Sequence, residues 1–256
     1  MTSPRLLPGI HDMISALTAA AHFDGLFVSG FGFSASHYGL PDVGFIAWPD
    51  MIAFVGRLRA ALPGHELLVD VDDGYGGPEI AGHVVRRLAS AGATGVVLED
   101  QARPRRFGHL AGKRLVPLPD QLEKLNAVLR ARDGLAVIAR TDAAEEPEIV
   151  RRVNAYVEAG ADGVLVAGIS NTRLIGLTRD AIGGRTLVFD QVPGGRSPWL
   201  SHAELAGLGV DVVVHSTTCL LAARAAMDGA LHAMKTGRRA EGVADVADCL
   251  ALLDVP

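Results

Sequence analysis

Carboxylate side chains gather at the ends of two short apolar segments of this 256-residue chain. Asp70, Asp72 and Asp73 end the segment 67–71, and Glu99 follows the segment 95–98. If these segments are strands, Asp70 and Asp72 point to the same side, because alternate residues of a strand share a face. Clustered carboxylates raise one another's pKa unless a cation lies among them, and oxygen-only ligands favour Mg²⁺ or Mn²⁺. The spacing therefore predicts a divalent metal site, partly held through water, with helix capping or pairing to arginine as the alternative.

A basic segment, 101–113, directly follows Glu99-Asp100 and contains Arg103, Arg105, Arg106 and Lys113. It is long for a connection between a strand and a helix, so it could close over an anionic substrate and exclude water. A solvated basic loop is the alternative interpretation.

Arg140 comes at the end of a further apolar segment, 135–139. A guanidinium at a buried strand terminus favours a bidentate carboxylate or phosphate, so Arg140 is expected to hold the substrate. Asp142, two residues later, is the alternative partner.

Two glycine-containing segments could bring backbone N–H groups close to substrate oxygens. The first is Ser29-Gly30-Phe31-Gly32, which follows the apolar segment 25–29, although a plain turn explains it nearly as well. The second is 194–198, where Gly195 and Ser197 could hold a second carboxylate.

Apolar segments and helical periodicity alternate along the whole chain, which is the pattern of βα units on a parallel sheet. Eight such units predict a single-domain (β/α)8 barrel over about residues 5–236 with a helical tail at 237–256, and a doubly wound open sheet is the alternative. Expected strands are 5–8, 25–29, 67–71, 95–98, 135–139, 163–166, 186–189 and 211–214; expected helices are 10–21, 49–62, 78–91, 118–131, 145–159, 172–182, 201–208 and 218–234.

Composition narrows the classes of function. The net charge is −5 and no run of Lys or Arg exceeds a pair, so no nucleic-acid partner is expected. No stretch is long and apolar enough for a membrane span and no signal peptide is recognisable, which predicts a cytoplasmic protein without membrane contact. Cys219 and Cys249 are too few for a disulfide framework.

Seven short motifs follow one another along the chain: Pro8-Gly9 with Asp12, Val-Ser-Gly at 28–30, Gly-Leu-Pro-Asp at 39–42, Asp-Val-Asp-Asp-Gly-Tyr-Gly at 70–76, Leu-Glu-Asp-Gln at 98–101, Gly-His-Leu-Ala-Gly-Lys at 108–113 and Ala-Arg-Thr-Asp at 139–142. Together they resemble the isocitrate lyase/phosphoenolpyruvate mutase superfamily. The resemblance implies a Mg²⁺- or Mn²⁺-dependent α/β barrel that acts on small 2-oxo or 2-hydroxy carboxylates through an enolate.

The resemblance also implies roles for individual residues. Asp70 matches the direct metal ligand, and Asp42, Asp72 and Glu99 match carboxylates that reach the ion or its waters. The remaining matched positions are expected to contact substrate or to act in catalysis: Ser29, Gly30, Phe31, Arg105, Phe107, Gly108, His109, Arg140, Asp190, Gly195 and Ser197.

Phe107 is the main departure from the lyase branch, whose loop carries an acidic cysteine at this place that protonates the departing enolate. Ala167 and Asp190 also differ, standing where lyases have a glutamate and often an asparagine. The mutase branch expects Glu-Asp-Lys followed by an asparagine-bearing loop, whereas this chain has Glu-Asp-Gln at 99–101.

The preferred interpretation is a carbon–carbon lyase or decarboxylase in which water or His109 supplies the proton and Phe107 enlarges the apolar lining. A P–C mutase or hydrolase and a degenerate ligand-binding homologue are the alternatives. The resemblance further predicts a homo-oligomer, a dimer or tetramer, in which the segment 240–253 is the candidate for a helix exchanged between subunits.

Overall fold

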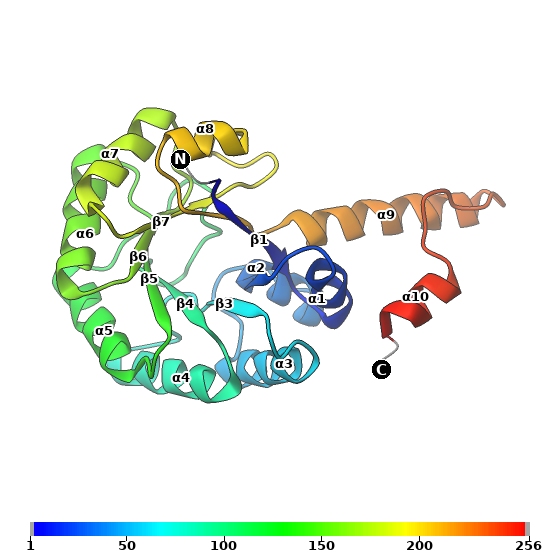
Figure 1. Ribbon diagram of the computed structural model, residues 1–256, viewed down its shortest axis with the longest axis horizontal. Coiled ribbons are helices and arrows are strands. Elements are labelled where there is room, and N and C mark those ends of the chain that lie inside the picture. Colours follow the sequence, from blue (N-terminus) through cyan, green and yellow to red (C-terminus); the bar gives the residue numbers. More distant parts are fainter. Residues whose placement is uncertain (1–2, 254–256) are drawn as a thin grey trace.

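Eight parallel strands close into one barrel in the computed structural model, which describes residues 3–253 (Figure 1). The strand order follows the chain, and β8 pairs with β1, with Leu7 opposite Val214, which excludes the open sheet. The predicted (β/α)8 barrel is therefore confirmed. The strands are β1 (Arg5–Ile10), β2 (Gly25–Val28), β3 (Glu66–Asp70), β4 (Gly95–Glu99), β5 (Ala136–Thr141), β6 (Gly163–Val166), β7 (Thr186–Asp190) and β8 (Val212–His215).

Helices surround the barrel and connect successive strands (Figure 1). Two of them end at glycines in the left-handed region, Gly92 with φ 95° and Gly160 with φ 105°, which stop the helix and return the chain to the next strand. The helices are α1 (Met13–Ala20), α2 (Gly30–Phe33), the π-helical turn η1 (Ser34–Tyr38), α3 (Trp48–Ala61), α4 (Pro78–Ala91), α5 (Leu118–Ala131), α6 (Glu146–Ala159), α7 (Thr172–Ile182), α8 (His202–Gly207), α9 (Thr218–Lys235) and α10 (Val246–Leu253).

Several boundaries differ from the sequence expectation. Strand β1 continues to Ile10, so the helix expected from residue 10 begins at Met13, where the Asp12 carboxylate accepts a hydrogen bond from the Ser15 N–H at 2.7 Å. Strand β5 ends at Thr141, which places Arg140 within the strand. The glycine-containing segment after β2 is not a plain turn but the first turn of α2, continued by η1.

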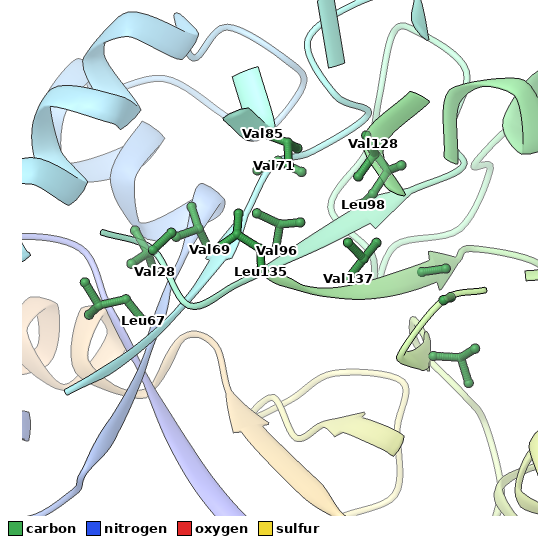
Figure 2. Close-up of a cluster of buried hydrophobic side chains, with 14 of the residues drawn as sticks. Val28, Leu67, Val69, Val71, Val85, Val96, Leu98, Val128, Leu135 and Val137 are labelled. Carbon is green, nitrogen blue, oxygen red and sulfur yellow. The ribbon is translucent and has the colours of Figure 1, made fainter. Parts of the chain in front are cut away.

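Alternating side chains of the strands form two apolar layers. The outer layer lies between barrel and helices; Figure 2 shows part of it, where Val71 and Leu98 lie with Val85 of α4 and Val128 of α5. The inner layer fills the barrel with one or two residues from each strand or its end: Leu7, Phe27, Leu68, Val97, Ile138, Leu165, Ala167, Val188, Val212 and Val214. Burying each large side chain contributes about 1.5–3 kcal/mol.

The chain after β8 departs from the compact barrel. Helix α9 projects away from it, and α10 lies apart from the strands (Figure 1). Neither helix buries a residue, and Met227, Leu231 and Met234 of α9 are all more than half exposed. The expected tail helix at 240–253 is shorter, beginning at Val246, and residues 254–256 of the expected tail lie outside the described residues.

Candidate active site

The inner layer determines which side chains reach the top of the barrel. Along a strand, the residue two positions after an inward-facing residue also points inward. Phe27 is thus followed by Ser29, Leu68 by Asp70, Val97 by Glu99 and Ile138 by Arg140. Asp190 and Ser216 follow Val188 and Val214 in the same way. These polar groups meet at the C-terminal ends of the strands, the face where barrel enzymes hold their active sites.

A closed chamber lies at this face. Its lining includes Ser29, Phe31, Asp42, Asp70 and Phe107, together with Phe27, Val97, Arg140, Leu165, Asp190, Val214 and Ser216. The chamber offers only about 20 Å³ to the centre of a water molecule, which is room for one or two waters. Seven of the fifteen predicted site residues therefore line this chamber, in a conformation too tight for a dicarboxylate: Ser29, Phe31, Asp42, Asp70, Phe107, Arg140 and Asp190.

Arg105 occupies the centre of the carboxylate cluster and is 1 % exposed. Its Nη1 atom lies 2.9 Å from Asp42 Oδ1 and 3.0 Å from Asp72 Oδ2, and its Nε atom donates to Glu99 Oε1. Burial lowers the pKa of Arg105, but the carboxylates outweigh it and raise that pKa. Three carboxylates thus hold the guanidinium of Arg105 in this conformation, and its role in catalysis stays a prediction.

Asp72 is the least satisfied member of the cluster. It is 1 % exposed, and neither of its carboxylate oxygens accepts a hydrogen bond from any described residue, since Arg105 approaches Oδ2 without hydrogen-bond geometry. Burial raises the pKa of Asp72 well above its usual value, and Asp42 and Asp70 raise it further. A buried carboxylate without a donor is a place where a cation would be stabilised.

Asp70 ends β3 beside Asp72 and close to Gly30. Its Oδ1 atom accepts the Asp72 N–H at 3.1 Å. A Cβ atom added at Gly30 would lie 3.1 Å from Asp70 Oδ2 and 2.9 Å from Asp72 Oδ1, so any larger residue would press on both carboxylates. Burial raises the pKa of Asp70, despite the opposing effect of Arg140.

Glu99 and Arg140 link the cluster to the next strand. Arg140 Nη2 lies 3.0 Å from Glu99 Oε2, and its Nε atom donates to Asp142 Oδ2 at 2.9 Å. Asp142 also accepts from Lys113 Nζ at 2.8 Å. Burial raises the pKa of Glu99 to about 7, against the opposing effects of Arg140 and Arg105. Asp142, the alternative considered from sequence, is indeed a partner of Arg140.

The charges of this cluster do not balance. Five carboxylates face three cationic side chains, which leaves an excess of two negative charges when every group is ionised: Asp42, Asp70, Asp72, Glu99 and Asp142 against Arg105, Lys113 and Arg140. One divalent cation would cancel that excess. Within residues 3–253, no three Asp, Glu, His or Cys side chains converge closely enough to act together as direct ligands of one ion.

The loop 101–113 closes over the chamber. The rings of Phe107 and Phe31 lie 4.9 Å apart, and the ring of His109 stacks on Phe107 at 5.6 Å. Gly108 rests on Arg140, since an added Cβ would lie 2.5 Å from Arg140 Nη2. Arg103 of the same loop donates two hydrogen bonds to the Asp73 carboxylate, from Nε at 2.7 Å and from Nη2 at 2.8 Å.

His109 is held with one ring nitrogen engaged. Its Nδ1 atom accepts the Arg196 N–H at 3.1 Å, so in the neutral ring the proton is assigned to Nε2. Nε2 lies 3.5 Å from Asp190 Oδ2 and has no hydrogen-bond partner among the described residues. Asp190 in turn accepts from the Ser216 hydroxyl at 2.9 Å.

Not every expected residue reaches the chamber. Gly195 lies against His109, where an added Cβ would be 2.5 Å from Nδ1, and neither Gly195 nor Ser197 lines the chamber. Their contact with a second carboxylate stays a prediction. Lys113 and Ser216 have no individual role in the sequence prediction, although Lys113 belongs to the basic segment and Ser216 to the polar residues that end the strands. The position of Ser216 two residues beyond the inward-facing Val214 is the signal that could have found it.

An eight-stranded barrel with charged groups converging at the C-terminal strand ends and a loop closed over them defines an α/β-barrel enzyme. The sequence matches the family model described as phosphoenolpyruvate phosphomutase over residues 1–235. This chain therefore belongs to the phosphoenolpyruvate mutase/isocitrate lyase superfamily, as its motifs predicted, and it is an enzyme.

Curated relatives support the same membership. The chain is 35% identical to the petal death protein of Dianthus caryophyllus, covering 90% of this chain and 74% of the relative. It is 33% identical to the 2,3-dimethylmalate lyase of Eubacterium barkeri, with 93% and 84% covered, and 34% identical to the 2-methylisocitrate lyase of Bacillus subtilis (strain 168), with 99% and 86% covered.

Solved structures agree with the fold. Oxaloacetate acetylhydrolase in complex with the inhibitor 3,3-difluorooxalacetate superposes with a TM-score of 0.92 at 29% identity, covering 98% of this chain and 87% of that one. A 2,3-dimethylmalate lyase gives 0.90 at 31%, with 98% and 85% covered. Phosphonopyruvate hydrolase in complex with oxalate and Mg²⁺ gives 0.84 at 28%, with 98% and 90% covered. No helix in the described part of this chain is long and apolar enough to span a membrane.

Proposed function

We propose that this enzyme is a divalent-metal-dependent lyase that cleaves a carbon–carbon bond of a 2-oxo or 2-hydroxy di- or tricarboxylate through an enolate. The observation that carries the proposal is the buried carboxylate cluster with two negative charges in excess, placed beside Arg140 in a chamber that a loop can close. Relatives named as lyases of methylisocitrate and dimethylmalate support this choice of substrate class.

The residues present fit a divalent cation. Asp72 offers two buried oxygens that accept no hydrogen bond, with Arg105 Nη1 at 3.0 Å from one of them, and Asp70 lies beside it on the chamber wall. Following the family resemblance, we propose Asp70 as the direct ligand and Asp72, Glu99 and Asp42 as carboxylates that act through water. Oxygen donors suit Mg²⁺, with Mn²⁺ as a substitute. When bound, the ion supplies Lewis-acid polarisation of a substrate oxygen.

The chain's own groups bind and orient the substrate. Arg140 lines the chamber and presents a guanidinium already positioned by Asp142, so it can hold a substrate carboxylate. Ser29 accepts the Gly32 N–H at 3.0 Å and fixes the first turn of α2. The first N–H groups of a helix lack partners within the helix, so Gly30 and Phe31 can donate to the same carboxylate.

The proton for the departing carbanion needs a source other than residue 107, because a phenyl ring carries no exchangeable proton. His109 is the proposed donor, since its Nε2 atom carries the assigned proton and lies 3.5 Å from Oδ2 of Asp190, which lines the chamber although His109 itself does not. Closure of the loop by Phe107 and Phe31 excludes bulk water while the bond breaks.

The test is product NMR on a panel of oxaloacetate, 2,3-dimethylmalate, 2-methylisocitrate and phosphonopyruvate, with Mg²⁺ or with EDTA. The proposal expects a 2-oxo acid, oxalate or CO2 from a carbon substrate only when the metal is present, and none from D70A. If phosphonopyruvate is the only compound of the panel that reacts, and it gives phosphate or phosphoenolpyruvate, the enzyme acts on a P–C bond instead. Turnover unaffected by EDTA would overturn the metal requirement.

We also propose that the protein is a cytoplasmic homo-oligomer, a dimer or tetramer. The support is α9, which carries Met227, Leu231 and Met234 exposed on a helix that the barrel does not cover. Light scattering is expected to give a multiple of 26.8 kDa that falls when Met227 and Leu231 are both changed to Asp. A monomeric wild-type protein would contradict the proposal.

A further inference from the structure

A second pocket of about 520 Å³ lies on the outer side of the loop that closes the chamber. Its walls are mainly apolar side chains from α2, from the segment after η1 and from the loop itself: Phe31, Pro41, Val43, Pro104, Phe107 and Leu110. Of its three charged members, Asp42 and Arg105 are paired with each other at 2.9 Å, whereas Arg106 is exposed and adds a positive charge at the rim. A pocket of this size and lining is typical of sites for apolar ligand groups.

The pocket and the chamber share a wall. Phe31, Asp42 and Phe107 line both spaces, and the rings of Phe31 and Phe107 lie 4.9 Å apart between them. The chamber alone, with about 20 Å³ for water centres, cannot hold a substrate of even four carbons. A displacement of either ring would join the polar chamber to the apolar pocket.

We infer that the substrate is a 2-hydroxy or 2-oxo carboxylic acid that carries a long alkyl or aryl substituent. Displacement of Phe31 or Phe107 joins the two spaces, so that the acid groups lie on the chamber side and the substituent lies in the outer pocket. The inference rests on the proposed lyase function, whose substrate class it narrows. Phe107 then acts as a specificity-determining residue that contacts the substituent. Leu110, which is 55% exposed and lines only the outer pocket, covers its far end.

Turnover of malates substituted with methyl, butyl, hexyl or phenyl groups at C2 or C3 tests the inference. Each added methylene that leaves water contributes about 0.8 kcal/mol and should raise kcat/KM about fourfold. L110N should lower the ratio of kcat/KM for the hexyl-substituted malate to kcat/KM for the methyl-substituted malate by about fivefold or more. I80N, which changes a similarly exposed aliphatic residue on α4 outside the pocket, should leave this ratio unchanged.

Binding of non-reactive alkylmalonates, measured by calorimetry, separates this inference from the lyase proposal. Affinity that rises with alkyl chain length and falls in L110N supports binding in the outer pocket. If these affinities are found but no malate is cleaved, the lyase proposal fails while the inference about the pocket stands. Cleavage of the methyl compound with rates and affinities that are flat or falling along the series overturns the inference and leaves the lyase proposal standing.

Discussion

Glu99 and Asp100 are consecutive, fully buried carboxylates, yet they belong to two different regions of the molecule. Glu99 points into the barrel, where it joins a cluster with more carboxylates than cations. Asp100 points outward, where it accepts from Thr141 Oγ1 at 2.7 Å, the Asp142 N–H at 2.9 Å and two side chains of α6. The alternation of a strand separates them.

The Asp100 region is complete without any further ligand. Arg152 donates at 3.0 Å and the Tyr156 hydroxyl at 2.7 Å, so both carboxylate oxygens of Asp100 accept hydrogen bonds from the protein itself. Because Asp100 binds the Asp142 backbone, it also fixes the residue that orients Arg140. One buried carboxylate thus supports the fold, and its neighbour in sequence is left for a ligand.

Asp70→Asn should have the largest effect, and it should act on activity alone. Removing the proposed direct ligand is expected to lower kcat/KM by about a thousandfold or more, since metal catalysis contributes several kcal/mol. The free energy of unfolding of the metal-free protein should stay level or rise, because the cluster loses one of its surplus charges. Steady-state kinetics and urea unfolding check both parts; a large loss of stability would contradict the assignment.

Asp100→Asn should do the reverse and act first on stability. It removes one of two carboxylate partners of the buried Arg152, which keeps Glu148 at 2.6 Å. Breaking a buried pair costs about 3–5 kcal/mol, so we expect a loss of about 3 kcal/mol, at the lower end of that range. The matched change Glu99→Gln should cost less, because the cluster around Glu99 holds surplus carboxylates. Urea unfolding of the metal-free variants is the measurement, and equal losses at the two positions would remove the distinction between the regions.

Tyr156→Phe sharpens the comparison with a smaller change. It deletes one hydroxyl that donates to Asp100 and should lower the free energy of unfolding by about 1.5–3 kcal/mol. Binding of Mn²⁺ should be unchanged, because Tyr156 lies on the outer side of the strands. Weakened metal binding in this variant would show that the two regions are coupled.

The pH dependence of stability gives a further comparison, between the wild type and Glu99→Gln. The folded pKa of Glu99 is raised to about 7 by burial, so between the ordinary carboxyl value and about pH 7 the folded protein holds a proton that the unfolded chain has lost. Its contribution to stability is therefore greatest at low pH and is lost as the pH rises to about 7. Metal-free wild type should lose more stability than Glu99→Gln over this range; parallel curves would contradict the raised pKa.

Much of the barrel could be predicted because its signals are local. An unbroken apolar strand marks each βα unit, and a glycine ends α4, α6 and α7. The bounds expected for α4, α5 and α7 agree with the structure. Closure between β1 and β8 joins the two ends of the chain and has no local signal. The short helix α2 was missed because Gly30 and Gly32 are typical of a turn, whereas Ser29 caps them as a helix.

The site was predictable to the level of its inward-facing residues. The period-two rule places Asp70, Glu99 and Arg140 together, and motif resemblance adds Asp42. Spacing could not show that Arg105 folds back among the carboxylates, because that contact spans 63 residues to Asp42. The outer pocket likewise depends on how two distant loops meet.

Titration with Mn²⁺, followed by electron paramagnetic resonance, tests most directly whether the surplus carboxylates on the Glu99 side form a metal site. The wild type and Tyr156→Phe should bind one Mn²⁺ per chain, displaced by Mg²⁺, and Asp70→Asn should bind at least tenfold more weakly. Wild-type protein that binds no Mn²⁺, or Asp70→Asn that binds it as tightly as the wild type, would contradict the account.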